Sequence, residues 1–149
     1  MSSVAIASEG ECGAGRPVTR DPRSCRLLLA EDDTATRALL ALGLRREGYE
    51  VVEAGNGIEL LTHLEAQVAT DAPPFDAIIS DVYMPGLGGF DVLAAVYCAC
   101  WPTPFIVMTA FADQGTYDEA RALGAAKVVE KPCSLGTLEA AVREVIAPA

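Results

Sequence analysis

The sequence contains few basic residues and only one histidine. Its 149 residues include 11 Lys and Arg against 21 Asp and Glu, which gives a formal net charge of −10. Proteins that bind nucleic acid or an anionic membrane present clustered Lys and Arg, so neither kind of partner is expected to bind directly. An acidic chain can still bind a divalent cation or the basic surface of another protein. Cation binding and protein binding are therefore the functions that the charge leaves open.

Cysteines at metal-ligand spacing and long apolar runs are also lacking. The five cysteines form no Cys-x-x-Cys pair and His63 is the sole histidine, so a zinc site is not expected. This usage favours free thiols in a reducing cytoplasm. No apolar run reaches the length of a membrane-spanning helix, and the N-terminus does not resemble a signal peptide. We expect a cytoplasmic protein without a membrane segment.

The chain divides near residue 25. Residues 1–24 mix Gly, Ser, Pro, Arg and Glu without periodicity, which predicts a flexible N-terminal tail or linker. Residues 25–149 suit one domain, in which short apolar runs alternate five times with amphipathic stretches. The expected strands are 27–30, 49–53, 75–80, 105–108 and 127–130. The expected helices are 34–47, 56–68, 90–97, 113–123 and 134–146, the first with Leu39, Leu42 and Leu44 at helical spacing. Asn56 and Ser134 are expected to cap the second and the last of them.

Five strand–helix pairs predict an α/β fold. Its core would be a five-stranded parallel sheet with helices on both faces. Unbroken apolar runs such as 105–108 suit strands that are buried on both sides. In doubly wound sheets of this kind, ligands bind at the carboxyl ends of the strands. The residues that directly follow the strands are therefore the candidates for a site.

Acidic, hydroxyl and basic residues follow four of the five predicted strands. In chain order they are Glu31, Asp32 and Asp33, then Asp81, then Thr109, then Lys131. Close carboxylates need a cation to remain ionised together, and their oxygens suit Mg²⁺. A lysine ammonium and a threonine hydroxyl can bind phosphoryl oxygens, and a carboxylate can attack phosphorus to give an aspartyl phosphate. The pattern therefore predicts phosphoryl transfer.

Four segments stand at the strand ends: 26–33 (RLLLAEDD), 78–86 (IISDVYMPG), 107–110 (VMTA) and 129–132 (VEKP). In this order they resemble the signature segments of the CheY-like response-regulator receiver family of two-component systems. The resemblance covers about residues 25–147 and implies the flavodoxin-like (βα)5 receiver fold. It implies a regulatory phosphoacceptor, not an enzyme acting on other substrates. The expected partners are a histidine kinase or phosphotransfer protein and an unknown downstream protein, with the receiver a monomer or weak dimer.

The resemblance implies a role for each acidic residue. Asp81 resembles the phosphoacceptor. Mg²⁺ is expected to contact Asp32, Asp81 and the backbone carbonyl of Tyr83 directly, and Glu31 through water. Asp33 is either a third carboxylate ligand or, as we favour, a helix-start residue that the helix dipole stabilises.

The resemblance also implies roles at the later strand ends, with one departure. Thr109 is expected to bind the phosphoryl group and Lys131 to pair with it, and the Lys131–Pro132 peptide bond is expected to be cis. Val128 stands three residues before Lys131, where many receivers carry Tyr or Phe. The usual aromatic coupling of phosphorylation to the partner-binding face is therefore not expected, and the output coupling is predicted to be atypical.

Two large aromatic residues flank the predicted site. Tyr83 and Phe111 lie two residues beyond Asp81 and Thr109 respectively. We predict that they restrict water and slow self-hydrolysis of the phosphoryl group.

Two alternative functions are left open. One is a degenerate receiver that acts only as a binding module. The other is a haloacid-dehalogenase-like phosphatase. That family carries Asp-x-Asp directly after the first strand, and this chain has Glu31 in the place of its nucleophile.

Overall fold

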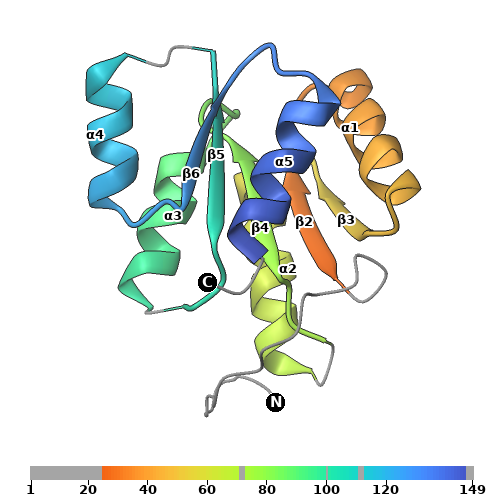
Figure 1. Cartoon of the computed structure of the whole chain (residues 1–149). Helices are drawn as coiled ribbons and strands as arrows, with labels where there is room; N and C mark the ends of the chain where they lie inside the picture. Colours follow the sequence, from red (N-terminus) through yellow and green to blue (C-terminus); the bar gives the residue numbers. More distant parts are fainter. Residues whose placement is uncertain (1–24, 71–72, 100, 111–112, 147–149) are drawn as a thin grey trace.

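A parallel sheet forms the centre of the computed structural model, which describes residues 25–70, 73–99, 101–110 and 113–146. Five strands pair in the order β3-β2-β4-β5-β6, as Figure 1 shows. They are β2 (Arg26–Ala30), β3 (Glu50–Ala54), β4 (Ala77–Asp81), β5 (Phe105–Thr109) and β6 (Lys127–Glu130). The predicted α/β fold is confirmed, with β6 as predicted and the ends of the other strands shifted by at most two residues. The predicted tail, 1–24, lies outside the described residues.

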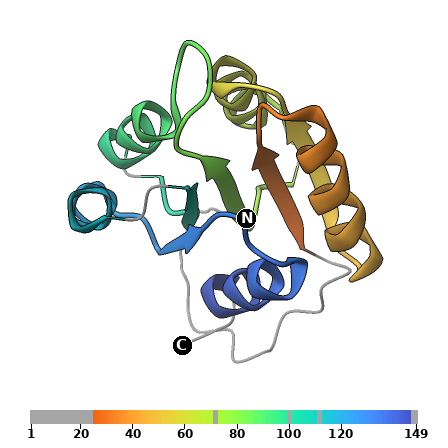
Figure 2. The same cartoon turned by 90° about the horizontal axis from the view of Figure 1, so that it is seen from above.

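Helices cover both faces of the sheet. They are α1 (Thr34–Arg46), α2 (Gly57–Ala69), α3 (Gly89–Cys98), α4 (Gln114–Ala122) and α5 (Leu135–Ile146). Seen from above, α1 and α5 lie on one side of the sheet and α2 and α3 on the other, with α4 beside α3 (Figure 2). Within this described part, every helix falls short of the length and apolar character that a membrane span needs.

Two apolar cores result from the alternation of side chains along the strands. Leu27 and Leu29 of β2 face the core under α1 and α5. Leu28 of the same strand faces the core under α2 and α3. Every residue of β4 and β5 is buried, as expected for central strands of a parallel sheet. The central strands that end at the predicted site are therefore packed on both faces.

The three leucines at helical spacing in α1 do not share its buried face. Leu44 is fully buried, but Leu39 and Leu42 are 69% and 48% exposed. Leu40 and Ala41 pack into the core instead. Because α1 carries leucine and alanine on two neighbouring stripes, helical spacing alone could not decide which stripe faces the sheet.

Side-chain caps begin three of the helices where the sequence placed them. The Asp33 carboxylate accepts the amide of Thr36 at 2.9 Å, and Asn56 and Ser134 cap the residues three positions on in the same way. The hydrogen bonds from the Thr36 hydroxyl and amide hold the pKa of Asp33 below its usual value. The interpretation of Asp33 as a helix-start residue is therefore confirmed.

Gly89 is required where α3 begins beneath the end of β4. A Cβ at this position would lie 2.3 Å from the backbone oxygen of Asp81. We therefore expect Gly89→Ala to lower the unfolding free energy by about 2 kcal/mol, because the overlap is with backbone. Gly136→Ala in α5 is the matched control, since its Cβ would meet no atom closer than 3.9 Å. Urea unfolding of both variants measures the difference, and equal stabilities would contradict the steric argument.

Candidate functional site

The predicted site residues gather at the carboxyl edge of the sheet. Glu31 and Asp32 follow β2, Asp81 ends β4, Thr109 ends β5 and Lys131 follows β6. Parallel pairing of these four strands brings their ends to the same edge. The sequence pattern therefore corresponds to a real cluster in space.

Three carboxylates form the acidic pocket, which we define as Glu31, Asp32 and Asp81. One oxygen from each lies within 4.8 Å of the others. Glu31 is 1% exposed and Asp81 is 6% exposed, whereas Asp32 lies at the surface. Two largely buried carboxylates beside a third are unfavourable unless positive charge offsets them.

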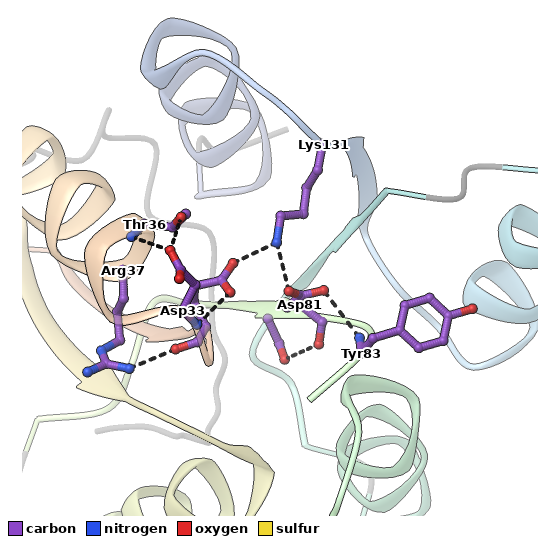
Figure 3. A network of polar contacts seen from close by, with 8 residues as sticks. Asp33, Thr36, Arg37, Asp81, Tyr83 and Lys131 are labelled. Carbon is purple, nitrogen blue, oxygen red and sulfur yellow. Dashed lines mark hydrogen bonds and ion pairs between the residues drawn. The ribbon is translucent and has the colours of Figure 1, made fainter. Parts of the chain in front are cut away.

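Lys131 supplies part of that positive charge. Its Nζ lies 2.8 Å from Glu31 Oε1 and 2.8 Å from Asp81 Oδ2, and Figure 3 shows it reaching over the pocket to Asp81. Burial works against the charged ammonium, but the hydrogen bonds and charges of Asp81 and Glu31 outweigh it and raise the pKa of Lys131. Partial desolvation and the neighbouring Glu31 raise the pKa of Asp32. One ammonium facing three carboxylates leaves a net negative pocket open to a cation.

Asp81 is fixed by its neighbours on both carboxylate oxygens. Oδ2 accepts from Lys131, and Oδ1 accepts the backbone amide of Tyr83 at 3.2 Å. Tyr83 is 59% exposed, and its ring points away from the Asp81 carboxylate (Figure 3). This arrangement does not support Tyr83 as a shield against water. Phe111, the other residue of that prediction, lies outside the described residues.

Thr109 and Lys131 are tied together through the backbone. The Lys131 amide donates to the Thr109 carbonyl at 2.7 Å. Thr109 is fully buried at the end of β5, and the Lys131–Pro132 peptide bond is cis. The ends of β5 and β6 therefore form one unit beside Asp81.

Val128, which stands where many receivers have Tyr or Phe, lies in β6 on the side of the sheet next to α4. This residue is half-buried and pairs with Val107. Tyr117 of α4 donates its hydroxyl to Glu130 Oε2 at 3.0 Å, and this bond raises the pKa of Tyr117. Glu130 directly precedes Lys131, so a hydrogen bond links α4 to the residue next to the pocket.

Arg37 is a site neighbour that the sequence interpretation missed. Its Nη1 donates to the backbone carbonyl of Glu31 at 2.8 Å. The available signal was an arginine in the first turn of α1, where the helix dipole disfavours a cation. A cation placed there needs other partners, and the Glu31 carbonyl and the Glu53 carboxylate on β3 provide them.

Comparisons with known proteins agree on one family. The profile described as "Response regulator receiver domain" matches residues 27–143. Transcriptional regulatory protein PdtaR of Mycobacterium tuberculosis is 36% identical over 118 residues, covering 78% of this chain and 54% of that protein. Sporulation initiation phosphotransferase F of Bacillus subtilis is 27% identical over 119 residues, covering 80% of this chain and 91% of that protein. The chain thus spans about half the length of PdtaR.

Solved structures have the same fold. Chemotaxis protein CheY4 of Vibrio cholerae superposes with a TM-score of 0.73 at 30% identity, covering 81% of this chain and 98% of CheY4. A receiver domain from a Francisella response regulator superposes with a TM-score of 0.73 at 23% identity, covering 82% and 96% of the two chains.

Proposed function

Because the chain belongs to the response regulator receiver domain family, we propose that it is a signalling switch that accepts a phosphoryl group on Asp81 beside a bound Mg²⁺. The carrying observation is the acidic pocket itself, in which Lys131 Nζ lies 2.8 Å from both Glu31 and Asp81. A buried carboxylate with an ammonium and two further carboxylates at hand is suited to take up a phosphoryl group and a cation together.

The residues of the acidic pocket fit Mg²⁺. Hard carboxylate oxygens from a few side chains, with Asp32 open to solvent, leave room for the water ligands that this ion keeps. Asp32, Asp81 and the Tyr83 carbonyl would hold the ion directly and Glu31 through water. A bound Mg²⁺ would neutralise charge on the carboxylates and on the incoming phosphoryl oxygens.

The reaction proposed is an in-line transfer from phosphohistidine of a histidine kinase or phosphotransfer protein. A carboxylate oxygen of Asp81 attacks phosphorus, the new O–P bond forms, and the P–N bond to the histidine breaks with its electrons returning to the imidazole. Lys131 and Thr109 bind the phosphoryl oxygens after transfer. The phosphorylated form then shifts the population towards a conformation that binds a downstream protein.

The wider assignment follows from the family and the sequence. Receiver domains are regulatory phosphoacceptors that interact with histidine kinases or phosphotransfer proteins. We propose that residues 25–149 form the receiver domain, that 1–24 form a tail or linker, and that the protein acts in the cytoplasm as a monomer or weak dimer without enzymatic turnover of other substrates.

The two alternative functions are distinguishable from this proposal. A haloacid-dehalogenase-like phosphatase would need an aspartate nucleophile directly after the first strand, where this chain has Glu31. A binding module without phosphorylation would have the same acidic pocket but would not become phosphorylated when mixed with a phosphoryl donor.

The test is phosphorylation by a small donor. We expect one phosphoryl group to be added, measured by intact mass, when the protein is mixed with Mg²⁺ and acetyl phosphate, and none when EDTA removes the cation. A beryllofluoride complex should form with the same cation dependence. If the mass does not change and the protein does not respond to beryllofluoride, it acts only as a binding module. Turnover of a generic phosphate ester would instead favour the phosphatase.

A further inference from the structure

Arg37 contacts the main chain behind the acidic pocket. Its guanidinium makes two hydrogen bonds in different directions, from Nη1 to the Glu31 carbonyl at 2.8 Å and from Nε to Glu53 Oε1 on β3 at 3.3 Å. The side chain is 19% exposed. Figure 3 shows Arg37 reaching the acidic residues from a different side than Lys131. It therefore holds the backbone of the pocket and leaves the carboxylates to Lys131 and a cation.

The bond from Arg37 acts on the peptide unit that leads to Asp32. The carbonyl of Glu31 and the amide of Asp32 belong to one planar unit, so holding the carbonyl also sets the direction in which the chain enters Asp32. The Glu31 amide is held separately by the Ala54 carbonyl of β3 at 3.1 Å. Arg37 therefore completes the anchoring of the loop that carries both carboxylates.

A second arginine provides a comparison within the same chain. Arg45 also forms an ion pair with Glu53, at 3.1 Å, and donates to a backbone carbonyl, that of Val51, at 2.8 Å. Like Arg37 it pairs with Glu53 and holds a backbone carbonyl, but Val51 lies in β3 away from the acidic pocket. The two arginines differ in whether the carbonyl they hold belongs to the pocket.

We propose that Arg37 is a positioning residue for the cation site: it holds the main chain of Glu31 against β3, so that Glu31 and Asp32 present their carboxylates beside Asp81 before a cation binds. The proposal rests on the proposed function of the acidic pocket. Partners that orient the ligands of a metal typically contribute 10- to 100-fold to its affinity, an order of magnitude that we take for this case.

Binding of Mn²⁺, measured by electron paramagnetic resonance, tests the proposal without any phosphorylation. We expect Arg37→Met to raise the dissociation constant of Mn²⁺ about tenfold, whereas Arg45→Met should bind Mn²⁺ as the wild type does. In the absence of metal, amide hydrogen exchange over residues 31–33 should be faster in Arg37→Met only, because the freed peptide unit opens more often.

Arg37→Lys separates charge from geometry. A lysine keeps the positive charge but lacks the planar guanidinium, whose Nη1 and Nε bond the Glu31 carbonyl and Glu53 separately. We expect weaker Mn²⁺ binding than in the wild type, with Arg45→Lys unchanged. This pair also carries the test if Arg37→Met does not fold. Wild-type affinity in Arg37→Lys would mean that charge alone suffices, and the positioning role would be overturned.

The same binding measurements distinguish the cation site itself from the positioning role of Arg37. If the wild-type protein binds no Mn²⁺, or if Asp32→Asn leaves Mn²⁺ binding unchanged, the acidic pocket is not the cation site. If the wild type binds and Asp32→Asn weakens binding, but the Arg37 variants match the Arg45 variants, only the positioning role is wrong.

Discussion

Replacing Asp81 with asparagine is expected to abolish phosphorylation of the chain. Asparagine keeps the size of the side chain and an oxygen that can accept the Tyr83 amide, which Asp81 Oδ1 accepts at 3.2 Å. It removes the nucleophilic carboxylate, because an amide oxygen does not form a stable acyl phosphate. We expect the rate of phosphoryl transfer from acetyl phosphate to fall by on the order of a thousandfold or more.

Asp118→Asn is the matched control for this substitution. Asp118 lies on α4, where its exposed carboxylate pairs with Arg121 at 3.5 Å. The intact mass of this variant should increase by one phosphoryl group, as in the wild type, while Asp81→Asn stays unmodified. Modification of Asp81→Asn at the wild-type rate would move the phosphoacceptor to another residue, and peptide mapping would then locate it. Thermal unfolding of both variants shows whether they remain folded.

Replacing Lys131 with methionine is expected to destabilise the metal-free protein by about 2 to 3 kcal/mol. The substitution keeps most of the apolar stem but leaves Glu31 and Asp81, with side chains 1% and 8% exposed, without their ammonium partner. A largely buried charge that loses its partner is costly, and two carboxylates lose the same one here. Mg²⁺ should bind Lys131→Met more tightly than the wild type, because the cation then replaces the missing positive charge.

The pH dependence of this destabilisation follows from the pKa of Lys131. The folded-state pKa is raised above the ordinary lysine value of 10.5. The stabilisation is therefore fully present below pH 10.5 and is lost as the pH rises through the folded-state pKa. The difference in unfolding free energy between the wild type and Lys131→Met should stay constant from neutral pH up to about 10 and narrow only above it.

Lys127→Met controls for the loss of a lysine as such. The Lys127 ammonium pairs with Glu144 at a position where both side chains are substantially exposed, so its loss should change the unfolding free energy by no more than about 1 kcal/mol. Urea unfolding in EDTA measures all three proteins. A Lys131→Met variant as stable as Lys127→Met would show that the buried carboxylates do not depend on the ammonium.

Much of the pocket could be predicted because strand-end residues in a parallel sheet converge whatever their separation in sequence. Glu31 and Lys131 are 100 positions apart, yet Lys131 Nζ bonds Glu31 Oε1 at 2.8 Å. The prediction needed only the strand ends, and each was marked by an apolar run followed by a charged or hydroxyl residue. Helix starts were predictable for a similar local reason, since Asp33, Asn56 and Ser134 cap amides only three residues away.

By itself the sequence determined the order of strands and helices along the chain, the edge of the sheet at which the polar residues meet, and which three carboxylates form the acidic pocket. These features depend on local apolar patterns and on the residues that follow each strand. Only the tertiary structure decided which stripe of α1 is buried, that the Tyr83 ring points away from Asp81, and that Arg37 holds the Glu31 backbone. These features depend on side-chain direction and on contacts between separate elements. Periodicity along one chain does not encode either of them.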